Sequence, residues 1–287
     1  MSKSSTASVS GSDSAGVEVV PGSDGALAGG GGGCGAGGFC GSPASAGVAS
    51  IPSSASASIN LFTVGLPPFS GADERDSIVP DGDYTESLFA QFWTLHLARD
   101  YYKALAVCDH LLEVIDPSDC RSHVRQANAR AMELRELCRF SESKAVHLAA
   151  RPFLPHVGPK VAGDYFHGLG CSHKGLGEYV RAFKALDRAL RLYRGAGFDE
   201  QADRAAVNIA RLYVVAGRPV QALALLDKME PCADSEIARA MAFEKEGDKS
   251  NARRAITRAL ALLADSSNEA TRAEALEVFD RIERRAL

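Results

Sequence analysis

The sequence predicts an all-α fold in which antiparallel helix pairs form a right-handed α-solenoid behind a disordered N-terminal tail. Three observations lead to this expectation. From about residue 84 onward, apolar positions recur with the helical period, and no stretch has the two-residue period of a strand. The joints between the helical stretches are short. The first 58 residues, by contrast, consist largely of Ser, Gly and Ala.

The N-terminal segment 1–58 has the composition of a disordered chain. Eight of the ten positions from Gly29 to Gly38 are glycine, and few residues of the segment are charged. Such a chain buries too little apolar surface to offset its backbone entropy. We therefore expect residues 1–58 to be disordered and residues 59–83, which contain Pro67-Pro68, to be a linker. The apolar run Leu61–Val64 within this linker is either a docking strand or a collapsed part of it.

The remainder, residues 84–287, is expected to be one helical repeat domain. Gly, Pro and Asp punctuate its joints, and such short joints force neighbouring helices to run antiparallel. The expected helices lie near residues 84–98, 101–115, 120–138, 141–150, 161–175, 178–194, 200–216, 219–229, 234–246, 249–264 and 268–285.

Internal repetition distinguishes a solenoid from a compact bundle. Within each unit a small residue is followed by an aromatic residue or His, then by a turn Gly, and then by an Ala in the next helix. The small residue lets the first helix approach the second closely, and the turn Gly relieves backbone strain. The units that show this pattern contain Leu169-Gly170, His173, Gly177, Tyr179, Ala182 and Ala189-Leu190; Ile209-Ala210, Tyr213, Gly217, Ala222 and Leu226; and Ala240, Phe243, Gly247, Ala252, Ile256 and Ala259-Leu260.

This pattern resembles the tetratricopeptide repeat (TPR) family. The match covers residues 163–196, 203–232 and 233–264, and it is weaker for 84–117 and 120–150, where the register stays open. The resemblance implies a solenoid that holds a peptide or helix of a partner protein in a concave groove lined by the first helix of each pair. Because the motif mainly reports packing, it does not identify the partner.

The repeat register places a set of polar side chains in that groove. Lys174, Arg204 and Arg211 predict a preference for a carboxylate-bearing segment, and Arg211 is the strongest single candidate because Arg can bind a carboxylate with two hydrogen bonds. The amide of Asn208 either grips a peptide backbone or makes a local contact within the solenoid. The full set of expected groove residues is His167, Cys171, Lys174, Arg204, Asn208, Arg211 and Met241.

The charges near these cations leave a simpler alternative open. Arg204 and Arg211 could pair with helix neighbours such as Asp203 or Glu200, and such surface pairs contribute only about 0–1 kcal/mol. Asp164 is the nearest expected counter-charge in these repeats.

Several other functions are disfavoured by the sequence. Residues 1–83 carry eight acids and two bases, a net charge of −6, so the whole-chain charge of −4 leaves only +2 for the rest, which argues against nucleic-acid binding. His167, Cys171 and His173 lack a fourth ligand, so no metal site is expected. No nucleophile elbow or Walker motif is present. We expect that the protein is not an enzyme and has no catalytic residue and no cofactor.

The expected location is the cytoplasm. The seven cysteines are scattered without a CxxC pair, as in a reducing compartment, and the N-terminus lacks the apolar core of a signal peptide. No apolar run is long enough for membrane insertion.

The expected function is therefore a scaffold or adaptor that binds a partner protein. One alternative is a ligand- or peptide-sensing TPR module of a transcriptional or signalling system, although residues 1–83 offer no helix-turn-helix. Self-association through the ends of the solenoid is a further option.

Overall fold

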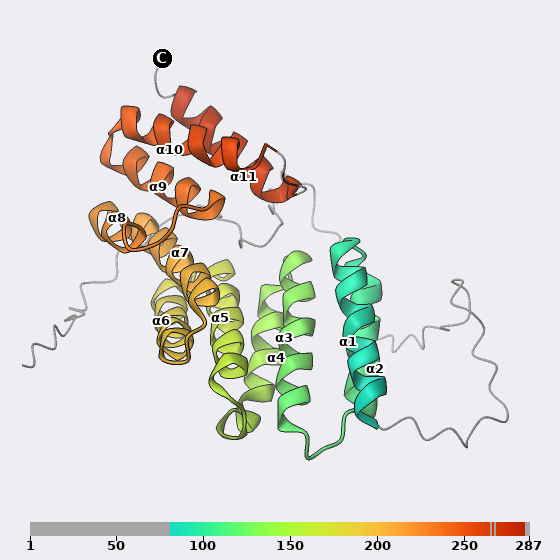
Figure 1. The fold of residues 1–287 in the computed structure, drawn as a ribbon. Helices are drawn as coiled ribbons and strands as arrows, with labels where there is room; N and C mark the ends of the chain where they lie inside the picture. Colours follow the sequence, from blue (N-terminus) through green and yellow to red (C-terminus); the bar gives the residue numbers. More distant parts are fainter. Residues whose placement is uncertain (1–80, 265, 267, 285–287) are drawn as a thin grey trace, which may run out of the picture. The chain divides into compact units, whose positions relative to one another are not determined.

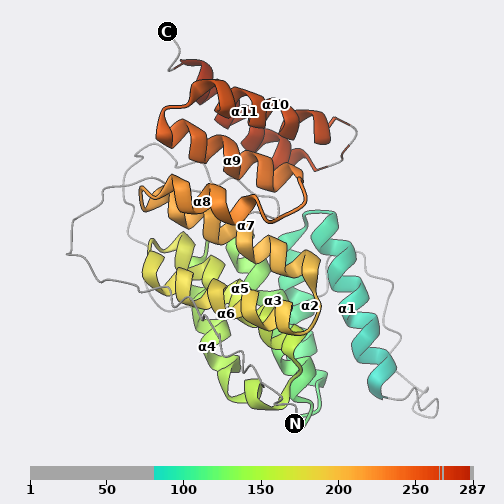
Figure 2. The ribbon, with the colours of Figure 1, turned by 60° about the vertical axis from the view of Figure 1, so that its left-hand side comes forward.

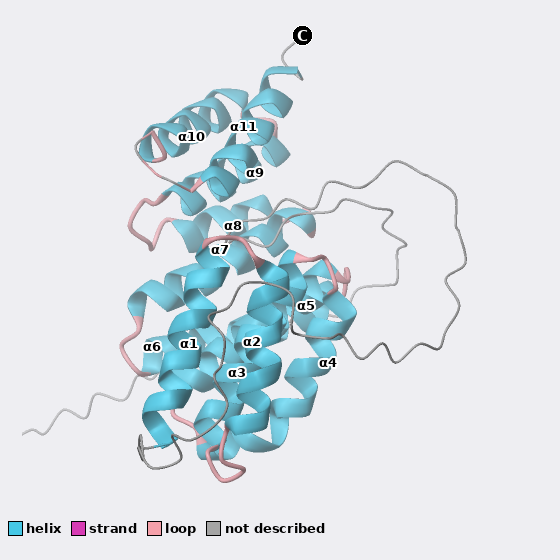
Figure 3. Ribbon diagram, turned by 90° about the vertical axis from the view of Figure 1, so that its right-hand side faces the viewer, coloured by secondary structure: helices cyan, strands magenta, loops and turns pink. Residues whose placement is uncertain are grey.

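The structure is a computed structural model that describes residues 81–264, 266 and 268–284. All regular secondary structure in these residues is helical (Figure 3). The expected disordered tail and the expected linker up to residue 80 lie outside the described residues.

Eleven α-helices and one short 3-10 helix make up the described chain (Figure 1). Their ends lie close to the expected ones; the 3-10 helix, with Pro152 and Pro155, was not expected. The helices are α1 (Asp81–Leu97), α2 (Tyr101–Val114), α3 (Cys120–Glu136), α4 (Phe140–Ala150), η1 (Arg151–His156), α5 (Pro159–Gly175), α6 (Tyr179–Gly195), α7 (Asp199–Val215), α8 (Pro219–Leu226), α9 (Ala233–Glu246), α10 (Lys249–Leu262) and α11 (Glu269–Arg284).

The helices pack in sequential antiparallel pairs. Each odd-numbered helix from α1 to α9 packs against the even-numbered helix that follows it, and that helix packs against the next odd-numbered one. Figure 2 shows α7 and α8 between the α5–α6 and α9–α10 pairs. The last helix, α11, lies against α9 and α10 through buried Ala275, Val278 and Ile282. This is the all-α solenoid that the repeats predicted.

All five turns inside the pairs share one backbone geometry, including two that lack glycine. The turn residues Gly177, Gly217 and Gly247 have φ of 72°, 71° and 83°, and Arg99 and Cys138 have φ of 59° in the equivalent turns. In each turn the next residue donates its N–H to a carbonyl of the first helix; the N–O distance is 3.0 Å from Asp100 to Leu95. The structure thus gives the register of the first two pairs.

Close helix approach occurs where the repeats predicted it. A Cβ added to Gly170 would lie 2.7 Å from Cγ of Leu186 and 3.3 Å from the carbonyl oxygen of Ala182. Ala210 and Ala240, at the same position of the next two units, are fully buried. The small residue therefore sets the distance between the two helices of each pair.

Enlarging this contact should destabilise the fold. Ala210→Leu inserts three carbons where the side chain is 0% exposed, so we expect the free energy of unfolding to fall by about 1–3 kcal/mol. Urea denaturation measures it, with Ala224→Leu on the exposed side of α8 as the control. Equal effects of the two substitutions would contradict the packing assigned to Ala210.

Candidate functional site

The first helices of the pairs contact one another through polar side chains on one side. Arg125 of α3 donates to Glu86 of α1 at 3.1 Å, and Arg135 of α3 donates to the carbonyl oxygen of Gly168 in α5 at 3.5 Å. The same side continues through α7 to α9. We call the surface formed by these side chains of α1, α3, α5, α7 and α9 the first-helix face.

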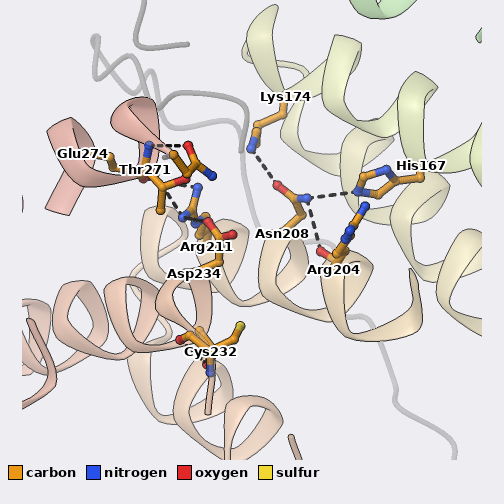
Figure 4. Close-up of polar contacts among 11 residues, drawn as sticks. His167, Lys174, Arg204, Asn208, Arg211, Cys232, Asp234, Thr271 and Glu274 are labelled. Carbon is orange, nitrogen blue, oxygen red and sulfur yellow. Dashed lines mark hydrogen bonds and ion pairs between the residues drawn. The ribbon is translucent and has the colours of Figure 1, made fainter. Parts of the chain in front are cut away.

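The centre of the first-helix face is the side-chain amide of Asn208 on α7 (Figure 4). Lys174 Nζ donates to Asn208 Oδ1 at 2.8 Å, and Asn208 Nδ2 lies 3.1 Å from His167 Nε2, both partners coming from α5. Nδ2 also donates to the carbonyl oxygen of Arg204 at 3.2 Å. Asn208 thus makes the local contact that the sequence left open, and contact with a partner peptide stays a prediction.

His167 is kept neutral by its surroundings. Burial, together with the nearby charges of Arg135, Lys174 and Arg204, lowers its pKa from 6.5 to about 3. A neutral ring leaves Nε2 free to accept the Asn208 N–H at physiological pH. We call Arg135, Lys174 and Arg204, the three cations that act on His167, the basic cluster.

The cations of the basic cluster differ in how they are held. Arg204 is exposed and pairs with Glu200 one helical turn away at 2.5 Å, which is the helix-neighbour pairing considered from the sequence. Arg135 is half-buried and forms no ion pair with another described residue. Arg135 was missed from the sequence because α3 lacks the turn glycine that would have set its register. Its equivalent position in α5 is that of Lys174.

Arg211 is engaged inside the solenoid. Its guanidinium lies 3.2 Å from Asp234 of α9 and 3.2 Å from Glu274 of α11, and only 7% of its side chain is exposed. The expectation that Asp164 is the nearest counter-charge is wrong for Arg211, which pairs with Asp234 and Glu274. Asp164 pairs with Lys160 at 3.1 Å. The repeat register ends before α11, so it could not predict that Glu274 of α11 contacts Arg211 of α7. A role of Arg211 in partner binding stays a prediction.

The remaining expected residues are mainly enclosed by neighbouring side chains. Cys171 is buried, and the half-buried Met241 packs against core residues on both of its sides. His173 faces Glu178, with Nδ1 2.5 Å from Oε2, and Glu178 has its pKa lowered to about 2 by hydrogen bonds from Lys144 and His173. Contact of Cys171 or Met241 with a partner is untested.

No group of three or more His, Cys, Asp or Glu side chains in the described part of the chain is arranged to hold a metal ion. None of the described helices has the length and apolar character needed to cross a membrane.

Solved TPR structures share this fold. The TPR-like repeats of a Podosopora anserina protein described as a kinesin light chain cover 64% of this chain and 97% of their own, at 14% identity and a TM-score of 0.52. BtubC (BKLC) from P. vanneervenii matches 64% of this chain and 81% of its own, with 16% identity and a TM-score of 0.54. A thermophilic TPR protein of Thermus thermophilus matches 68% and 98%, with 16% identity and a TM-score of 0.51.

These likenesses agree with the repeat pattern and the helix pairing. No family model matches the sequence, and the search of curated proteins gives no match. The chain has a TPR-like α-solenoid fold.

Proposed function

We propose that the protein is a non-enzymatic scaffold or adaptor of the cytoplasm, whose first-helix face binds an acidic segment of a partner protein. The observation that carries the proposal is the basic cluster. Lys174 contacts the Asn208 amide, which also contacts His167 and the carbonyl oxygen of Arg204. Arg135 reaches the carbonyl oxygen of Gly168, the residue after His167. Asn208 and the neutral His167 lie at its centre, so a carboxylate group of a partner placed there would be attracted by all three cations.

The setting favours charge-assisted hydrogen bonds. Arg135 and Lys174 are half-buried, so water screens a bound carboxylate less than it would at a fully exposed site. Arg135 can hold a carboxylate with two parallel N–H donors, whereas Lys174 acts as a point charge. The exposed pair of Arg204 and Glu200 contributes only about 0–1 kcal/mol, so a partner carboxylate can replace Glu200 at little cost.

All residues expected to line the groove belong to the proposed site. His167, Lys174, Arg204 and Asn208 form the centre, and Arg135 joins them from α3. Cys171 contributes to the wall between them. Arg211 and Met241 lie toward α9 and α11 and form the edge of the proposed site.

Charge reversal in the basic cluster should abolish acidic-peptide binding. The double substitution Arg135→Glu and Lys174→Glu replaces two attractive charges with repulsive ones, so we expect affinity for a fluorescein-labelled Gly-Glu repeat peptide to fall at least about 100-fold. Fluorescence anisotropy at low and high salt measures the affinity. The matched control is Lys184→Glu with Arg194→Glu, which makes the same charge change at two exposed positions of α6.

The outcomes separate binding from folding and from net charge. Equal loss in the two double variants would assign the binding to overall charge and contradict the proposed site. Circular dichroism reports whether each variant is folded. If the Glu variant unfolds, Arg135→Gln with Lys174→Gln removes the two charges without introducing repulsion, and unchanged affinity there would also contradict the proposal.

A further inference from the structure

We infer that the partner segment also carries an aromatic or large aliphatic side chain, which packs on Trp93 and Leu97 at the α1 end of the first-helix face. This inference rests on the proposed function for the acidic part of the partner. It adds an apolar anchor, and with it a basis for choosing between acidic partners.

Trp93 belongs to the first-helix face by its position in the repeat. The turn residues Arg99, Gly177 and Gly217 have the same backbone geometry, and Trp93 precedes its turn by the same number of residues as Cys171 and Arg211 do theirs. Leu97 follows Trp93 by one helical turn on the same side of α1. Both therefore lie on the side of the chain where the proposed partner binds.

Both side chains are exposed although they are apolar. Trp93 is 50% exposed and Leu97 is 79% exposed, and they are neighbours on one helix. Large apolar side chains that gather on a surface commonly mark a contact with another molecule. Aromatic residues, Trp above all, dominate the energy of such contacts.

The location of this apolar pair favours the partner segment as its occupant. The buried side of α1 carries Leu88 and Phe92, which belong to a core shared with α2. Trp93 and Leu97 lie instead on the first-helix face, where the acidic part of the partner is proposed to bind. A segment bound on this face can reach them, whereas a second copy of the chain would need a contact of its own.

The Trp93 ring is held in place before any partner arrives. It meets the rings of Phe92 and His96 edge-on, with centroids 5.3 Å and 5.6 Å away. His96 Nδ1 lies 2.7 Å from Oε1 of the fully buried Glu133 in α3. An immobilised aromatic ring loses little conformational freedom on binding, so more of its contact energy appears as affinity.

The apolar pair and the basic cluster are joined through one helix. Glu133, which holds His96 and thereby the Trp93 ring, precedes Arg135 of the basic cluster by two residues in α3. Arg135 in turn reaches Gly168 of α5 at 3.5 Å. A single extended or helical segment that places its carboxylates on Arg135 and Lys174 can therefore continue toward α1.

Trp93 is the only tryptophan in the sequence, so its fluorescence reports this site directly. The probes are Gly-Glu repeat peptides with a Leu-Phe pair at the N-terminus, at the C-terminus or at neither end. We expect one anchored peptide to bind about tenfold more tightly than the plain one and to shift the Trp93 emission to shorter wavelength. The plain peptide should bind without that shift.

Substitutions separate the anchor from the acidic contact. Trp93→Ala should remove the tenfold advantage, measured by anisotropy, and leave the affinity for the plain peptide unchanged. The matched control is Tyr102→Ala, which removes another exposed aromatic side chain (73% exposed) at the start of α2 and should keep the advantage. If Trp93→Ala does not fold, Leu97→Ala tests the same surface from the neighbouring position.

Each outcome decides one of the two proposals. Equal affinity of plain and anchored peptides, with acidic binding intact, would overturn the anchor and leave the proposed function standing. Failure of every peptide to bind the unaltered protein would instead contradict the proposed function. An emission shift that grows with protein concentration in the absence of peptide would assign Trp93 and Leu97 to self-association and overturn the inference.

Discussion

Replacing Arg211 with alanine is expected to lower the free energy of unfolding by about 2–4 kcal/mol. The substitution leaves Glu274, which is 15% exposed, without its cation and removes a link among α7, α9 and α11. The lower end of the range applies if water reaches the freed acids, because Asp234 is 45% exposed. Urea or thermal denaturation, followed by circular dichroism, measures the change.

The exposed Arg204 provides the control for this prediction. Arg204→Ala removes the same type of side chain from the same helix, but its pair with Glu200 has both side chains at least 67% exposed, so stability should change by about 0–1 kcal/mol. If Arg211→Ala left the melting temperature unchanged and abolished peptide binding, Arg211 would be a partner contact. Its ion pairs with Asp234 and Glu274 would then contribute little to stability.

The second large expected effect is a loss of folding stability at low pH, which comes from His147. This ring is fully buried in α4, where Nδ1 donates to the carbonyl oxygen of Ser143 at 2.9 Å and Nε2 has no hydrogen-bond partner among the described residues. Burial, together with the nearby charge of Arg135, lowers its pKa from 6.5 to about 3. A proton on Nε2 would find no acceptor in the described part of the chain.

The direction of the pH dependence follows from which state of the chain, folded or unfolded, binds the proton. Between pH 6.5 and about 3 the unfolded chain holds a proton on this His and the folded chain does not, so stability is present above pH 6.5 and is lost as pH falls. Each pH unit corresponds to about 1.4 kcal/mol, and by pH 5 the loss through His147 is about 2 kcal/mol. Glu136 acts oppositely, because burial raises its pKa to about 7 and its stabilising proton is lost as pH rises.

Comparison with a variant isolates the contribution of His147. His147→Asn keeps a side-chain N–H donor for the Ser143 carbonyl and cannot take up the proton. The variant should lose stability at pH 8, where the packing of the ring on Tyr165 is missing, but the deficit should shrink by about 2 kcal/mol between pH 8 and pH 5. A deficit that stays constant over this range would mean that His147 is protonated in the folded protein.

The sequence predicted the turns and the close helix contacts correctly where the residue type itself indicates the backbone conformation or the packing. Gly177, Gly217 and Gly247 marked three turns because glycine adopts positive φ without strain, and these turns set the register of α5 to α10. The turns at Arg99 and Cys138 have the same geometry without that signal. The first two pairs were therefore found as helices but not aligned.

The contacts within the site could not be predicted in full, because they join helices that are far apart in the sequence or whose register was not known. Arg211 was expected to line the groove, but its partner Glu274 comes from a helix 63 positions later in the chain. Arg135 was not considered, because its place on α3 follows only from the unaligned turn at Cys138. Lys174, Asn208 and His167 were brought together as expected from the register, although the amide had no predicted partner.

The position of Lys174 has a mechanical consequence. Its ammonium group is one of the links between the third and fourth helix pairs, because it donates to Asn208 across the joint. A carboxylate that draws Lys174 toward itself weakens this link, whereas His167 and the carbonyl of Arg204 keep hold of the other end of the amide. The pairs would then turn about the remaining bonds, so occupancy of the face by a partner would be converted into a change in the pitch of the solenoid.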